Sequence, residues 1–222
     1  YQFQCDYSEG AHPRIIEKLV ETNMEQTAGY GCDPYCESAA LLIRKLCNAP
    51  YADVHFLVGG TQTNATVISS VLRPHQGVLS VKSGHINVHE TGAIEATGHK
   101  VIAVPSSDGK ARPELVERIV INQKSVEDAE HIVQPKMLYI SNPTEDGTLY
   151  SLSELEALSG ICRAHGLYLF VDGARLGYGL AAKGNDITLA DYARLCDAFY
   201  IGGTKVGTMF GEALVIPNVA IA

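Results

Sequence analysis

Two charged residues could take part in covalent or acid–base chemistry, because each follows a short apolar run of β-strand character. Asp172 ends the run 167–171, and Lys205 follows the run 198–202 among glycines. A carboxylate at the end of a buried strand needs a partner to stay ionised, which Arg175 or a bound cation would supply. Loss of solvent favours the neutral, nucleophilic form of a lysine, which Schiff-base chemistry requires. Taken singly, a structural Asp–Arg pair and a solvated surface lysine explain the same residues.

A glycine turn offers a place for a phosphate group. Gly59 and Gly60 follow the apolar run 53–58, and Thr61 and Gln62 then open a helical pattern. Free backbone N–H groups at a helix N-terminus, together with a hydroxyl, favour an anion. The turn lacks the Lys-Ser or Lys-Thr of a P-loop and the glycine spacing of a dinucleotide site. A capped strand-to-helix turn without a ligand is the alternative interpretation.

The chain that carries these residues alternates strands with helices. Short apolar runs bounded by Gly, Pro, Asn or Asp predict strands at 53–58, 77–82, 100–105, 136–142, 167–172, 198–202 and 212–217. Helical patterns cover 34–47, 61–72, 91–97, 112–123, 151–165 and 188–196. We therefore expect an α/β fold with a mainly parallel seven-stranded sheet sandwiched by helices. The short link between the last two strands predicts that the final strand runs antiparallel to its neighbour.

One domain, residues 34–222, accounts for this pattern, and residues 1–33 form a polar N-terminal arm. The arm contains a short amphipathic helix that carries Ile15, Ile16, Leu19 and Val20. Among the 222 residues, 17 Lys and Arg stand against 25 Asp and Glu, and the net charge of −8 argues against binding to nucleic acid or to an anionic membrane.

The remaining composition favours a cytoplasmic protein. Apolar runs stay short of the roughly 18–20 residues that cross a membrane, and residues 1–6 lack the basic and apolar parts of a signal peptide. We expect the six cysteines to be free thiols. Cys32 and Cys36 near His12 have a spacing at the edge of the zinc pattern and no second pair, so we expect no metal site.

In open α/β sheets ligands bind at the carboxyl ends of the strands, where several polar residues fall. Gly60 and Thr61 follow the first predicted strand, His85 the second, Asp172 the fifth and Lys205 the sixth. Pyridoxal phosphate (PLP) requires a helix start for its phosphate, an aspartate that keeps its pyridine nitrogen protonated and a lysine that bonds its aldehyde. A ring-sized histidine completes such a site. The joint pattern therefore predicts a PLP site.

On these residues, the sequence resembles the threonine aldolase and β-eliminating lyase family of fold-type-I PLP enzymes over essentially the whole chain. The segments that carry the resemblance are 6–13, 29–33, 59–64, 85–93, Asn142, 172–175 and 203–205. The resemblance implies the large domain of the aspartate aminotransferase fold. It also implies a PLP-dependent lyase that cleaves the Cα–Cβ bond of a β-hydroxy-α-amino acid, threonine or a close analogue, to glycine and an aldehyde.

The resemblance implies roles for single residues. Lys205 would be the Schiff-base lysine, Asp172 the partner of the pyridinium nitrogen, and His85 the ring that stacks on the cofactor. Arg175 would bind near the cofactor's phenolic oxygen and the substrate carboxylate. The other cofactor contacts would be Gly60, Thr61, Gln62 and Thr204. Cys5 would contact the substrate carboxylate, where the family usually has a serine.

A second departure from the family affects the base of the reaction. The family has a further histidine just after the asparagine, but Asn142 is followed by Pro143, Thr144 and Glu145. The base that removes the β-hydroxyl proton is therefore open among the freed Lys205, His85 and water. β-Elimination or transamination on the same scaffold, and a non-catalytic assembly domain, are the alternative functions.

The resemblance also bears on assembly and extent. Family members are homo-oligomers, so it implies a homodimer or homotetramer acting on an amino acid. Family members also carry a small C-terminal domain, and we expect this domain to lie outside the present chain.

Overall fold

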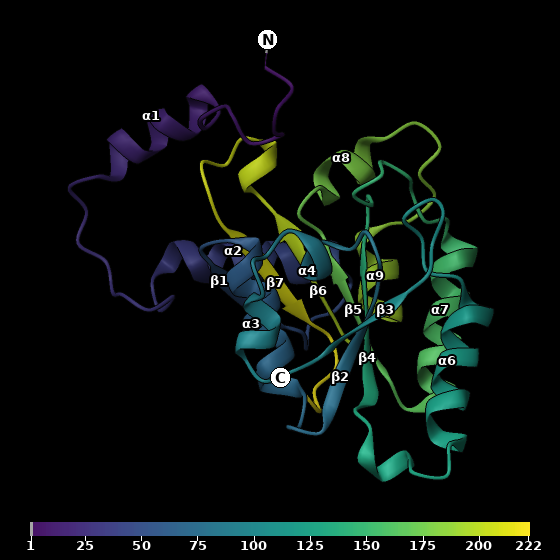
Figure 1. Ribbon diagram of the computed structural model, residues 1–222. Helices are drawn as coiled ribbons and strands as arrows, with labels where there is room; N and C mark the ends of the chain where they lie inside the picture. The colour runs from purple at the N-terminus through teal and green to yellow at the C-terminus, as the bar shows by residue number, and fades with distance from the viewer. Residues whose placement is uncertain (1) are drawn as a thin grey trace.

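The computed structural model describes residues 2–222, and within them seven strands form one sheet. The strands are β1 (Asp53–Leu57), β2 (Gln76–Val81), β3 (Val101–Val104), β4 (Gln134–Ser141), β5 (Tyr168–Asp172), β6 (Ala198–Gly202) and β7 (Glu212–Ile216). They lie in the order β1-β7-β6-β5-β4-β2-β3 (Figure 1). Among these strands, β7 alone runs in the opposite direction, antiparallel to β1 and β6, and the other pairs are parallel. The predicted strands and the reversed last strand are confirmed.

Helices surround the sheet, as the alternating pattern predicted. They are α1 (Pro13–Thr22), α2 (Pro34–Leu46), α3 (Gly60–Val71), α4 (His85–Val88), α5 (Ala93–Ala96), α6 (Pro113–Ser125), α7 (Leu152–His165), α8 (Leu176–Ala181) and α9 (Leu189–Leu195). Two 3₁₀ turns, η1 (Ala129–His131) and η2 (Thr204–Val206), complete the helical elements of residues 2–222. Periodicity did not predict α4 and α8, because four residues hold no repeat and α8 contains two glycines.

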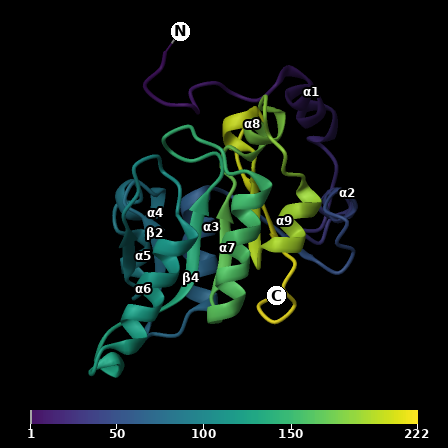
Figure 2. The same ribbon diagram turned by 90° about the vertical axis from the view of Figure 1, so that its right-hand side faces the viewer.

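The sheet is covered on both faces because successive side chains of a strand point to opposite sides. Leu138 and Ile140 of β4 belong to the core that includes residues of α6, α7 and α9. Met137 and Tyr139 of the same strand belong to the core that includes residues of α3, α4 and α5. Figure 2 shows α6, α7 and α9 side by side over one face. The continuous apolar strands of the sequence thus reflect burial from two sides.

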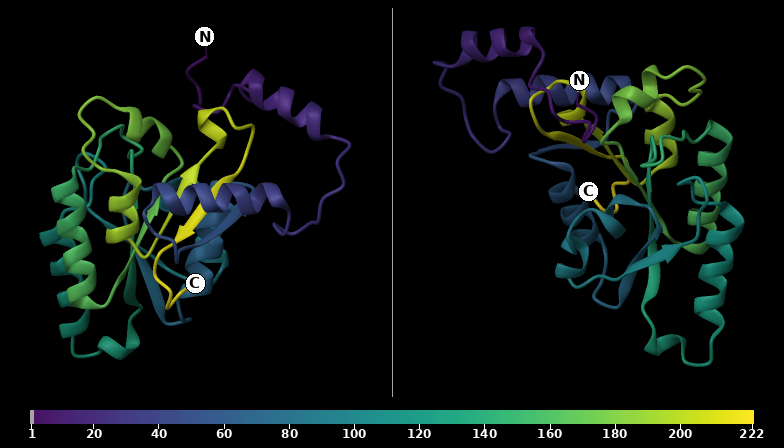
Figure 3. Two further views of the ribbon diagram at one scale, coloured as in Figure 1. Left: turned by 180° about the vertical axis from the view of Figure 1, so that it is seen from behind. Right: turned by 45° about the horizontal axis from the view of Figure 1, so that its top comes forward.

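The N-terminal segment leaves this layered body. Figure 3 shows α1 standing apart from the sheet, with a loop leading back to α2. None of the residues Pro13–Thr22 is buried, although the helix is strongly amphipathic. Its apolar side, including Leu19 and Val20, is exposed. Within residues 2–222, no helix has both the length and the apolar character that a membrane crossing needs.

Candidate active site

A cavity of about 410 Å³ lies at the edge of the sheet where the parallel strands end. It is lined by seven residues that the sequence predicted for the site: Gly60, Thr61, His85, Asp172, Arg175, Thr204 and Lys205. It is also lined by Tyr7, Val58, Gly59, His89, Glu145, Ala174, Tyr200, Phe210 and Glu212. Lys205 and Asp172, which the sequence predicted to hold one ligand between them, therefore line the same cavity. Cys5 and Gln62 are not among the lining residues.

Asp172 ends β5 and is held by three donors. Its Oδ2 atom accepts hydrogen bonds from the hydroxyl of Tyr139 and, at 3.2 Å, from Nδ2 of Asn64. Its Oδ1 atom accepts from the backbone N–H of Ala174 at 2.9 Å. The residue is 4% exposed, so these donors replace the water that a carboxylate requires. Arg175, the partner considered from the sequence, contacts Asp6 instead.

Tyr139 is a permanent donor to this carboxylate. Burial, together with the charge of Asp172, raises the pKa of Tyr139 well above its ordinary value. The phenol therefore keeps its proton across the physiological range.

His85 begins α4 and faces the cavity beside an acidic partner. Its Nδ1 atom lies 2.7 Å from Oε1 of Glu90, a residue that is only 4% exposed. The hydrogen bond to Glu90 outweighs burial and raises the pKa of His85 above its ordinary value. The imidazole is therefore more readily protonated than that of an ordinary histidine. The ring of His89 lies 5.5 Å away, centroid to centroid.

The glycine turn leads into α3, as the sequence predicted. No side chain caps the helix start at Gly59, so its first N–H groups are available to an anion. A Cβ atom on Gly60 would lie 3.0 Å from the hydroxyl of Tyr200, which explains the need for a small residue. Gln62 accepts a hydrogen bond from the N–H of Val58 at 3.1 Å and so closes the turn itself.

Thr204 lies at the same cavity but already has polar partners. Its hydroxyl donates to Glu212 at 3.4 Å and accepts from the N–H of Gly211 at 3.2 Å. These contacts tie the η2 turn, and Lys205 with it, to the start of β7.

Lys205 shares a carboxylate of the arm with Arg175. Its Nζ atom lies 3.1 Å from Oδ1 of Asp6, and Nε of Arg175 donates to Oδ2 of the same residue. Burial opposes ionisation of Asp6, but the bonds to Arg175 and Lys205 outweigh it and lower the pKa of Asp6 below its ordinary value. The neighbouring Cys5 bonds to Ser8 at 3.3 Å.

Two acidic residues of the cavity were not predicted as site residues. Glu145 accepts from the hydroxyl of Ser141 at 2.6 Å and from the backbone N–H of His85 at 3.1 Å, and burial raises its pKa. Burial and the charge of Asp172 raise the pKa of Glu212 to about 7. The reversed direction of β7 places its first residue beside the last residues of the parallel strands. A strand predicted to be antiparallel could have revealed Glu212.

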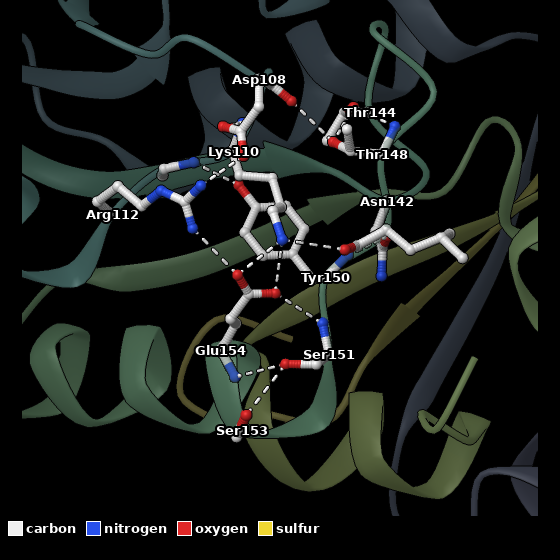
Figure 4. Close-up of polar contacts among 12 residues, drawn as sticks. Asp108, Lys110, Arg112, Asn142, Thr144, Thr148, Tyr150, Ser151, Ser153 and Glu154 are labelled. Atoms are coloured by element: carbon white, nitrogen blue, oxygen red, sulfur yellow. Dashed lines mark hydrogen bonds and ion pairs between the residues drawn. The ribbon is translucent and has the colours of Figure 1, made fainter. Parts of the chain in front are cut away.

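The loop that carries Glu145 is fixed by a polar cluster (Figure 4). Asn142, at its start, accepts from the N–H of Tyr150 at 3.2 Å and donates to the hydroxyl of Tyr192 at 2.6 Å. Lys110 donates to both carboxylate oxygens of Glu154, which also forms the capping box of α7 with Ser151. Asn142, whose position helped to carry the family resemblance, is thus engaged in holding the loop.

Comparison with known proteins shows the family. A model of the beta-eliminating lyase family matches residues 2–221. The low specificity L-threonine aldolase of Pseudomonas sp. (strain NCIMB 10558) is 29% identical over an alignment of 223 positions that covers 100% of this chain and 63% of the relative. That of Pseudomonas aeruginosa is 28% identical over 98% of this chain and 62% of the relative.

Similar solved structures include a threonine aldolase and an aminotransferase. The threonine aldolase of Leishmania major has a TM-score of 0.94 and 54% identity, covering 98% of this chain and 62% of that one. An aspartate aminotransferase of Thermus thermophilus with maleate has a TM-score of 0.72 and 19% identity, covering 96% of this chain and 56% of that one, and so shares the fold. The chain thus spans less than two thirds of the length of these proteins. Its fold is that of the fold-type-I enzymes, and the chain belongs to the beta-eliminating lyase family.

Proposed function

We propose that the protein binds PLP and cleaves the Cα–Cβ bond of a β-hydroxy-α-amino acid, threonine or a close analogue, to give glycine and an aldehyde. The observation that carries the proposal is the placement of Lys205, Asp172 and His85 around one cavity that also contains an open helix start at Gly60. The similarity to named threonine aldolases supports the choice of reaction.

The residues present fit the cofactor. Among residues 2–222, five buried side-chain polar atoms have no partner, and two of them, Oε2 of Glu145 and Oε2 of Glu212, belong to residues that line the cavity. Unpartnered buried polar atoms are rare in folded proteins, and these two suit a cavity that takes a ligand with a hydrogen-bond donor. The N–H groups at Gly60 and Thr61 would hold a phosphate, Asp172 a protonated ring nitrogen, and Lys205 an aldehyde carbon.

The chemistry divides between cofactor and chain. When bound, PLP supplies an aromatic ring that accepts the electron pair released at the substrate Cα. Asp172, which accepts hydrogen bonds from Tyr139, Asn64 and Ala174, would hold a proton on the ring nitrogen. His85 and its partner Glu90 would present a flat cationic ring to one face of the ligand.

The substrate would contact a cation that binds its carboxylate and a group that accepts the proton of its β-hydroxyl. Arg175 supplies a cation for its carboxylate, provided that Asp6 gives way or shares the guanidinium. Lys205, His85 and a water molecule are the candidate acceptors of the β-hydroxyl proton. Substrate contact by Cys5 and cofactor contact by Gln62 stay predictions from the family pattern.

The test is made on the complete protein supplied with PLP. We expect a visible absorbance that Lys205→Ala abolishes and that Lys183→Ala, a change at an exposed lysine, preserves. L-threonine or L-allo-threonine should then yield acetaldehyde and glycine. Keto acid and ammonia would instead identify β-elimination, and amino-group transfer would identify transamination. A colourless protein with unchanged assembly would leave only the non-catalytic function.

Assembly is proposed as a homodimer or homotetramer. The support is an exposed apolar group on α2, consisting of Tyr35, Leu41, Leu42 and Leu46, which such contacts would cover. Light scattering of the complete protein tests this, and a monomer would reject it. The division into an arm of residues 1–33 and a large domain of residues 34–222, and a cytoplasmic location, stay predictions.

A further inference from the structure

Two buried carboxylates of the site share one side-chain amide. Nδ2 of Asn64 donates to Oε1 of Glu90 at 2.7 Å and to Oδ2 of Asp172 at 3.2 Å. Asn64 is fully buried in α3. An amide nitrogen carries two N–H donors, so these two bonds use both of them.

The orientation of this amide suits its two neighbours. Turned by 180°, Asn64 would place its Oδ1 atom, an acceptor, against two carboxylate oxygens that are also acceptors. The orientation with Nδ2 between them is therefore the one that gives both carboxylates a donor.

The two bonds are part of a longer chain. Oε1 of Glu90 also contacts Nδ1 of His85, and Oδ2 of Asp172 also accepts from the hydroxyl of Tyr139. This series of hydrogen bonds passes from His85 through Glu90, Asn64 and Asp172 to Tyr139. In the amino-acid sequence, Asn64 lies 26 positions from Glu90 and 108 positions from Asp172. The side chain that faces the cavity at α4 is thus linked, through buried groups alone, to the carboxylate at the end of β5.

Electrostatics explains why the central amide matters. Two carboxylates that approach each other in a medium of low dielectric repel each other. The N–H donors of Asn64 lie between them and hold both in place. Without these donors, Glu90 would lose the contact that fixes its Oε1 atom beside Nδ1 of His85, and Asp172 would lose one of its three donors.

We infer that Asn64 is a positioning residue that bridges Glu90 and Asp172 and thereby couples the protonation of His85 to the position of Asp172. The meaning of this coupling for catalysis rests on the proposed function, because His85 and Asp172 are the residues proposed to hold PLP. The titratable groups that face His85 are Glu90, Asp172, Glu145 and His89. Those that face Asp172 are Tyr139, Tyr200, Glu145 and Glu212.

The coupling is measured on the complete protein without cofactor, so that a failure of PLP binding cannot imitate its absence. The ring resonances of His85, identified with His85→Gln, are followed by NMR as the pH is raised. Asn64→Leu should lower the pKa of His85 by about one unit, because Glu90 is then no longer fixed beside the imidazole. Asn87→Leu is the matched control. Asn87 lies in α4 with His85 but donates to the carbonyl of Lys82, which is not part of this series of hydrogen bonds. It should leave the His85 titration unchanged.

A double variant separates coupling from a general loosening of the site. Glu90→Gln alone should lower the pKa of His85, and adding Asn64→Leu should then change little, whereas independent structural effects would add. An unchanged His85 titration in Asn64→Leu would overturn the inference. If that variant does not fold, the side-chain N–H resonances of Asn64 in the unmodified protein decide, because they must shift with the same midpoint as His85. Asn64 resonances that do not shift during the His85 titration would also overturn the inference.

Discussion

The Nζ atom of Lys205 lies 3.1 Å from Oδ1 of Asp6, so the N-terminal arm brings a carboxylate to the amine proposed to react with the cofactor. Arg175 contacts the same carboxylate through its other oxygen. One carboxylate of the arm therefore pairs with two basic side chains of the cavity. The arm makes two further contacts: the N–H of His12 donates to the carbonyl of Gly207, and Nζ of Lys205 lies 5.8 Å from the ring centroid of Tyr7.

Replacing Asp6 with Asn should release the arm. Partly exposed ion pairs are worth about 1 kcal/mol, so backbone hydrogen exchange of residues 2–12 should rise roughly fivefold. Glu9→Gln, at an exposed acid of the same arm, is the control and should leave exchange unchanged. Equal exchange in Asp6→Asn and the unmodified protein would show that other contacts hold the arm.

The same pair predicts an acid-sensitive arm. The pKa of Asp6 is lowered in the folded protein from an ordinary value of 3.8. Its stabilising effect is therefore complete above that value and is lost as the pH falls through the lowered pKa. Hydrogen exchange of residues 2–12 should rise below about pH 4 in the unmodified protein. In Asp6→Asn it should already be high at pH 6 and show no such rise.

The sequence was sufficient to predict the seven strands, because continuous apolar runs bounded by turn residues are a local signal. The residues that follow the parallel strands could also be predicted to lie together, because parallel strands end at one edge of the sheet. The partners of those residues were not. Asp172 is satisfied by Tyr139 and Asn64, which lie 33 and 108 positions away, whereas the sequence suggested the nearby Arg175. Such pairings depend on three-dimensional packing that periodicity does not encode.

Glu212→Gln should stabilise the cofactor-free protein in a pH-dependent way. The folded-state pKa of Glu212 is about 7, against an ordinary 4.5, so the folded protein loses stability as the pH rises between these values. An uncharged glutamine avoids that loss. Urea unfolding should show a gain of about 1–3 kcal/mol at pH 8 and no gain at pH 4. The same gain at both pH values would exclude ionisation of Glu212 as its cause.

Asp172→Asn should separate cofactor binding from catalysis. A neutral amide cannot stabilise a protonated ring nitrogen, so kcat for threonine cleavage should fall at least about 100-fold. The absorbance of bound PLP should persist, because Lys205 and the turn at Gly60 are unaltered. Asp128→Asn, at an exposed loop residue, provides the comparison. Unchanged kcat in Asp172→Asn would remove Asp172 from the proposed mechanism.

Replacing two glycines with alanine should change the free energy of unfolding in opposite directions, because one lies where β5 and β6 approach closely beneath the cavity and the other lies in open space. A Cβ atom on Gly173, next to Asp172, would lie 1.8 Å from the backbone oxygen of Tyr200 in β6, and backbone cannot move aside as a flexible side chain can. Gly173→Ala should therefore cost at least about 3 kcal/mol of unfolding free energy. A Cβ on Gly160, exposed within α7, meets no atom of residues 2–222 within 4 Å. Gly160→Ala should stabilise the protein by about 0.5–1 kcal/mol, since alanine favours the helix interior. Urea unfolding measures both. A tolerated Gly173→Ala would mean that the end of β5, and with it Asp172, is not fixed against β6 as tightly as the proposed site requires.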